Sequence, residues 1–88
     1  MFEWDTAKEQ SNIAKHRVDF RTASRVFLDP FLIEIEDDRH DDETRWNVID
    51  MVDGRMLFVT YTERNDRICI ISARGAEPHE RRKYHDLI

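Results

Sequence analysis

The dipeptide Asp53-Gly54 separates two alternating segments, and this feature limits the possible folds more than any other. Asp-Gly in such a position favours a two-residue hairpin. The flanking residues 45–52 (RWNVIDMV) and 55–63 (RMLFVTYTE) are therefore predicted to pair as antiparallel strands. Residues 64–66 form the next turn, and residues 67–74 (RICIISAR) form the next strand. Strands joined in this way predict an antiparallel meander.

Two helices are predicted before the strands. Asp5 is a suitable N-cap for a helix that runs from Thr6 to about residue 15. Asp19 is a second N-cap candidate, and the apolar residues that follow it, up to Phe27, recur at helical spacing. Pro30 ends this second helix, because the residue before a proline is driven out of the helical region.

Three shorter segments complete the predicted fold. Residues 2–4 and 31–36 alternate as short strands do, and residues 79–86 form a last helix that begins near Pro78. The 88 residues are expected to form one α+β domain. Its four- to five-stranded antiparallel meander would have two N-terminal helices on one face and one C-terminal helix.

The negative charge of the chain is concentrated in one segment. The net charge is −5, but residues 34–43 (EIEDDRHDDE) alone carry −6, so the other 78 residues sum to +1. Of the 14 basic side chains 11 are Arg, whose planar fork suits phosphate or carboxylate. The acidic balance therefore does not exclude an RNA partner.

Composition also excludes several classes of site. One Cys rules out a disulfide framework or a Cys-based zinc site, and two Gly rule out P-loop and dinucleotide motifs. Asp38, His40 and Asp42 remain an alternative cation-binding set, although their spacing is not that of a calcium loop. The sequence contains no membrane-spanning run and no signal peptide is expected, which predicts a cytoplasmic protein.

A set of polar residues near the C-terminus could perform metal-free RNA cleavage. Arg74 is expected to end a strand face that begins with Ile68, close to a helix where Glu80 and Tyr84 share one face. Ile70 and Ser72 are expected on the same strand face as Arg74. Such cleavage needs a base for the 2′-hydroxyl, cations for the phosphorane and an acid for the leaving oxygen. A purely structural alternative pairs Arg74 with Glu80 and packs Tyr84 on the sheet.

The chain resembles the BrnT family, the toxins of BrnT/BrnA type II toxin–antitoxin pairs. The matching segments run in order along nearly the whole chain. They are Phe2-x-Trp4-Asp5-x-x-Lys8, Asn12-x-x-Lys15-His16-x-Val18-x-Phe20, Ala23, Val26-Phe27-x-Asp29-Pro30, Glu43-x-Arg45, Gly54-Arg55-x-Leu57, Arg67-Ile68-x-Ile70-Ile71-Ser72-Ala73-Arg74, Glu80-Arg81 and Tyr84.

The resemblance implies a RelE-like endoribonuclease that uses no metal or other cofactor and inhibits translation. Its expected partners are the RNA substrate and a BrnA-like antitoxin with a ribbon-helix-helix DNA-binding part. Toxin and antitoxin would form a hetero-oligomer around an antitoxin dimer. The residues implied are Arg74 as the cation on the scissile phosphate, Glu80 as a candidate base, Tyr84 as a base or orienting group, Lys15 and His16 as cations or proton carriers, and Arg45, Arg67 and Arg81 as RNA-binding residues.

Structural alternatives remain open for these residues. Lys15 and His16 can simply terminate a helix, and Arg45 can pair with Glu43. Arg17 stands where the family usually has Gly after Lys-His, and a left-handed conformation there would cost on the order of 1 kcal/mol.

Two rival functions also remain open. One alternative to the nuclease is a binding module that holds its antitoxin with weak or no nuclease activity. The other is an orphan structural domain. The acidic residues expected to face a basic partner are Asp37, Asp38, Asp41 and Asp42.

Overall fold

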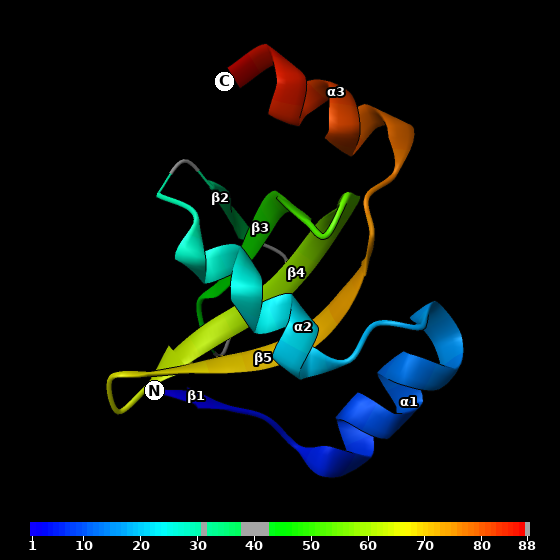
Figure 1. The fold of residues 1–88 in the computed structure, drawn as a ribbon. Helices are drawn as coiled ribbons and strands as arrows, with labels where there is room; N and C mark the ends of the chain where they lie inside the picture. Colours follow the sequence, from blue (N-terminus) through cyan, green and yellow to red (C-terminus); the bar gives the residue numbers. More distant parts are fainter. Residues whose placement is uncertain (31, 38–42, 88) are drawn as a thin grey trace.

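A five-stranded sheet with three α-helices makes up the computed structural model, which describes residues 1–30, 32–37 and 43–87 (Figure 1). In chain order the elements are β1 (Phe2–Glu3), α1 (Thr6–His16), α2 (Phe20–Ala23), the 3-10 helix η1 (Ser24–Leu28), β2 (Ile33–Asp37), β3 (Arg45–Val52), β4 (Arg55–Arg64), β5 (Arg67–Gly75) and α3 (Pro78–Leu87). The fold class is α+β, as predicted. No helix in these described ranges is long and apolar enough to cross a bilayer.

The sheet is mixed, with the strand order β1-β5-β4-β3-β2. Strands β2 to β5 form the predicted antiparallel meander. The prediction of a wholly antiparallel sheet is wrong, because β1 pairs with β5 in parallel and aligns Phe2 with Ile68. A long crossover separates β1 from β5 in the sequence, so no tight turn forces these two strands to be antiparallel.

Helices α2 and η1 cover one face of the sheet. Phe20, Ala23 and Val26 are fully buried there, in a core that includes Val48 and Val59 from the central strands. The predicted single helix over residues 20–27 is instead a short α-helix that continues as a 3-10 helix.

Helix α1 lies beside the outer edge of β5, not on the sheet face predicted for both N-terminal helices. Asn12 is the one buried residue of α1, and its side-chain amide bonds both the N–H and the C=O of Ala73. Because β1 pairs with β5 only at residues 68 and 69, the edge at Ala73 needs this substitute partner.

Asp5 and Asp19 cap α1 and α2, as predicted. The carboxylates accept hydrogen bonds from the amides of Lys8 and Thr22, each at 2.9 Å. Helix α1 ends at Arg17, which adopts the left-handed conformation with φ 59° and ψ 36°. A side chain therefore occupies a conformation that glycine adopts at no steric cost.

A bulge in β5 determines which way Arg74 points. Thr60 aligns with Ser72, whereas the next residue, Tyr61, aligns with Ile70, so Ile71 is an extra residue in the strand. The prediction that Ile68, Ile70, Ser72 and Arg74 share a face is therefore wrong. Ile70 belongs to the core, while Ser72 and Arg74 lie on the opposite face, which we call the open face.

Candidate active site

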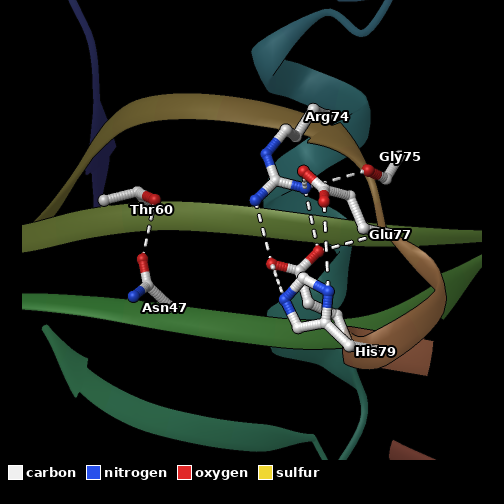
Figure 2. A network of polar contacts seen from close by, with 7 residues as sticks. Asn47, Thr60, Arg74, Gly75, Glu77 and His79 are labelled. Atoms are coloured by element: carbon white, nitrogen blue, oxygen red, sulfur yellow. Dashed lines mark hydrogen bonds and ion pairs between the residues drawn. The ribbon is translucent and has the colours of Figure 1, made fainter. Parts of the chain in front are cut away.

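Arg74 and Glu80 form a two-pronged ion pair on the open face. Arg74 Nη1 lies 2.8 Å from Glu80 Oε1, and Nη2 lies 2.9 Å from Oε2. Figure 2 shows the Arg74 guanidinium over strand β4, on the side of the sheet away from α2. The Arg74 side chain keeps 29% of its surface exposed, against 9% for Glu80. The cation is thus the accessible partner of the pair.

Further contacts restrict the guanidinium, among them an ion pair of Nη1 with Glu77 Oε1 at 3.6 Å. Its carbon lies 4.3 Å from the centre of the Phe58 ring, a residue that aligns with Arg74 across the β4–β5 ladder. Nη1 also donates to the carbonyl of Gly75 at 3.2 Å. Cation–π contact and bidentate pairing both restrict the plane of the group, so its orientation is determined before any ligand arrives.

Glu80 is held in turn by the beginning of α3. Its Oε1 accepts the backbone N–H of Glu77 at 2.8 Å, and the Glu77 carbonyl accepts the N–H of Glu80 at 3.0 Å. The Glu80 carboxylate thus supplies one half of a capping box, in which the side chain of the third helical residue satisfies the N-cap amide. The same carboxylate therefore starts the helix and orients Arg74.

Ionisation of Glu80 follows from these contacts. Burial by itself would raise the pKa of the carboxyl, but the hydrogen bonds from Arg74 and from the Glu77 amide outweigh it, and the pKa lies below its ordinary value. Glu80 is a carboxylate at neutral pH with both oxygens engaged. Such a group is better suited to positioning Arg74 than to removing a proton.

Tyr84 lies elsewhere and contacts Asp50 of β3. Its hydroxyl donates to Asp50 Oδ1 over a long 3.4 Å. Asp50 is only 1% exposed, and burial, helped by neighbouring Asp29, raises the pKa of its carboxyl to about 6. The pKa of Tyr84 is raised by burial and by the same two acids. Tyr84 thus joins α3 to the sheet.

Lys15 and His16 end α1 beside β5. They line a surface hollow of about 210 Å³ together with Asn12 and Ser72. The carbonyl of His16 accepts a hydrogen bond from Arg55 Nη2 at 3.3 Å. Ser72 shares the open face with Arg74, so this hollow borders the face on which the ion pair lies.

The predicted RNA-binding arginines are distributed over three elements. Arg45 of β3 lines a hollow of about 250 Å³ with Thr62 and Cys69. Arg67 is exposed and lies 3.6 Å from Glu3 Oε2. Arg81 is exposed on α3. Glu43, proposed above as a partner for Arg45, forms a two-pronged pair with Arg64, with a shortest distance of 2.9 Å.

Most of the acidic residues expected to bind a partner lie outside the described part of the chain. Asp38, Asp41 and Asp42 lie outside the described residues, as does His40 of the alternative cation site, and only the backbone of Asp37 is described, at the end of β2.

Comparison with known families decides the assignment. The family model for BrnT, the ribonuclease toxin of a type II toxin–antitoxin system, matches residues 4–80. The chain belongs to the BrnT family. No curated protein matches it. Most of the predicted site residues lie inside the matched range, whereas Arg81 and Tyr84 lie beyond it. A type II family implies an antitoxin as the partner of this BrnT protein.

Three open-face residues were not singled out from the sequence. Phe58 carries the Arg74 guanidinium, and Thr60 donates to Asn47 Oδ1 at 2.8 Å on the neighbouring strand (Figure 2). His79 lies 3.9 Å from Glu80 Oε2. The His79-Glu80 adjacency was visible in the sequence, but the Phe58–Arg74 alignment depends on the bulge.

Proposed function

We propose that this BrnT protein is a metal-independent endoribonuclease that inhibits translation in the cytoplasm. In this proposal a BrnA-like antitoxin with a ribbon-helix-helix part neutralises it, and residues 1–88 act as one RelE-like toxin domain. The observation that carries the proposal is the accessible Arg74 guanidinium, fixed in orientation by Glu80 and Phe58. A preoriented cation is what a phosphorane-like transition state requires.

Arg74 would bind the scissile phosphate and stabilise the charge that develops when the 2′-hydroxyl attacks. Glu80 would hold the guanidinium in place as a positioning residue. Lys15 and His16 would supply further positive charge or carry protons along the edge of β5, and Arg45, Arg67 and Arg81 would contact the RNA backbone.

The proposed cleavage also needs a titratable group near Arg74 that transfers a proton. Glu80 was the candidate base, but both its oxygens are engaged and its pKa is lowered. His79 is exposed beside it, with Nε2 3.9 Å from Glu80 Oε2, and an imidazole can serve as a general acid or base. We propose His79, alongside His16, as a proton carrier, with Tyr84 as a residue that orients α3 through Asp50.

Cleavage of RNA by the purified protein in EDTA tests this function. Arg74→Ala is expected to lower kcat/KM by about a hundredfold or more. Arg21→Ala is the matched control, since Arg21 is exposed on α2 over the other face, and it should cleave as the wild type does. Equal cleavage by Arg74→Ala, or cleavage only when metal is added, would contradict the mechanism.

The alternative function is a binding module, and one observation favours it: Glu80 engages both prongs of Arg74. A well-folded wild type that binds antitoxin but cleaves no RNA, and does not arrest growth when expressed alone, would establish that alternative.

A further inference from the structure

A second surface site lies between η1 and the end of β3. A hollow of about 260 Å³ is lined by Arg25, Leu28, Asp29, Asp50, Met51, Val52 and Asp53, and we call it the acidic hollow. None of its lining residues is among the contacts described above for Arg74 or Glu80, although Asp50 is linked to α3 through Tyr84.

Asp50 is a buried acceptor that lines the acidic hollow beside Asp29. Asp50 is 1% exposed, and its Oδ1 receives the long hydrogen bond from Tyr84. Its Oδ2 has no hydrogen-bond partner within the described part of the chain. A buried carboxylate oxygen without a donor is costly, so a donor from outside would be bound favourably.

The charge of the lining residues selects a cationic donor. Asp29, Asp50 and Asp53 contribute three carboxyl groups, whereas Arg25 is the one cation among the lining residues. Arg25 Nη1 already pairs with Asp53 Oδ2 at 2.6 Å. The surplus of negative charge around Asp50 therefore favours an ammonium or guanidinium group.

The rim of the acidic hollow indicates a protein and not a free ion. Leu28 is 80% exposed and Met51 is 43% exposed, and both line the hollow. Large apolar side chains beside one binding hollow are typical of a surface that another macromolecule covers. A bare cation would leave this apolar surface in water.

We propose that the acidic hollow is an antitoxin-binding site that takes a Lys or Arg side chain onto Asp50, while an apolar neighbour of that side chain covers Leu28 and Met51. The inference rests on the proposed neutralisation by an antitoxin. It places part of that interface at η1 and β3.

Calorimetric titration of the full chain with its cognate antitoxin tests the site. Leu28→Ser and Asp50→Asn are each expected to weaken binding about tenfold or more, since one removes apolar contact and the other removes the charge. Ile13→Ser and Asp66→Asn are matched controls on other surfaces and should stay within about twofold of wild type. Leu28→Ser should cleave RNA like the wild type, because Leu28 touches no part of the Arg74 site.

Other results of these experiments would overturn the proposed antitoxin-binding site. Unchanged affinity in both variants would overturn the site while leaving the nuclease and its antitoxin in place. Failure of the wild type to bind antitoxin would overturn the proposed neutralisation, and the site with it. If magnesium or calcium alone raises the Tm of wild type but not of Asp50→Asn, the hollow is an ion site and the proposal is wrong. If Asp50→Asn does not fold, the exposed pair Leu28→Ser and Met51→Ser carries the test.

Discussion

Arg74 and Glu80 meet side by side, with Nη1 to Oε1 at 2.8 Å and Nη2 to Oε2 at 2.9 Å. This arrangement connects the end of β5 to the first turn of α3. It makes the orientation of Arg74, the proposed phosphate-binding cation, depend on a carboxylate that is itself fixed by the Glu77 amide. A mutation at Glu80 can therefore distinguish a positioning role from the role of a general base.

Glu80→Gln is expected to lower kcat about tenfold and to leave the shape of its pH profile unchanged. The amide keeps one acceptor for Arg74 but loses the charge that holds the guanidinium in place. The measurement is RNA cleavage from pH 5 to pH 9. A loss of a hundredfold or more, with disappearance of the acidic limb, would identify Glu80 as the base instead.

The same pair makes stability depend on acid. The pKa of Glu80 is lowered on folding from the ordinary value of 4.5, so its contribution is present above that value and is lost as pH falls through the folded pKa. The unfolding free energies of wild type and Glu80→Gln should therefore converge below about pH 4.5. A gap that stays constant down to pH 3 would contradict the assignment.

Asp50 should make the stability of the fold depend on pH in the opposite direction to Glu80. Burial raises the pKa of its carboxyl from 3.8 to about 6, so its protonated form stabilises the fold below pH 3.8 and this contribution disappears as pH rises through 6. Asp50→Asn keeps an acceptor for Tyr84 and removes the buried charge. We expect the variant to gain on the order of 2 kcal/mol over wild type at pH 7 and little at pH 4. Urea unfolding at both pH values measures this, and a loss of stability at pH 7 would show that Asp50 is stabilised as a carboxylate.

Local sequence signals correctly predicted most of the helices and strands. Asp53-Gly54 correctly predicted the β3–β4 hairpin, because that turn requires residues that tolerate positive φ, and both have it. Asp5 and Asp19 predicted the helix starts by the same local logic. These features depend on a few neighbouring residues, so a single sequence contains them.

Features that depend on distant partners were missed. The extra residue Ile71 is defined only by its alignment against Thr60 and Tyr61, and a strict alternation of residues therefore placed Arg74 on the wrong face. The parallel pairing of Phe2 with Ile68 involves a strand of two residues. Asp50 lies on β3 between Val48 and Val52, and strand alternation places all three side chains on the same apolar face. This alternation was the one sign in the sequence that Asp50 is buried.

Arg17→Gly should stabilise the protein by about 1 kcal/mol. Arg17 has φ 59°, a conformation that costs a side chain roughly this amount and costs glycine nothing. Arg17→Ala is the control, since it removes the same side chain but keeps the Cβ, and it should bring no comparable gain. Thermal unfolding of the three proteins decides the matter: equal gains from both variants would assign the effect to the Arg side chain and not to the backbone.

Asn12→Ala should destabilise the fold by about 2–4 kcal/mol. The Asn12 side chain donates to the carbonyls of Val18 at 2.9 Å and of Ala73 at 2.8 Å, and it accepts the Ala73 N–H at 3.1 Å. Truncation leaves these buried backbone groups without their partner and detaches α1 from the edge of β5. Ser11→Ala, on the exposed neighbouring position, should change stability by less than about 0.5 kcal/mol. Urea unfolding gives the free energies, and hydrogen exchange of the Ala73 amide should accelerate in Asn12→Ala alone. A loss below about 1 kcal/mol with unchanged exchange would mean that water or another group satisfies the strand edge and that Asn12 does not hold α1 in place.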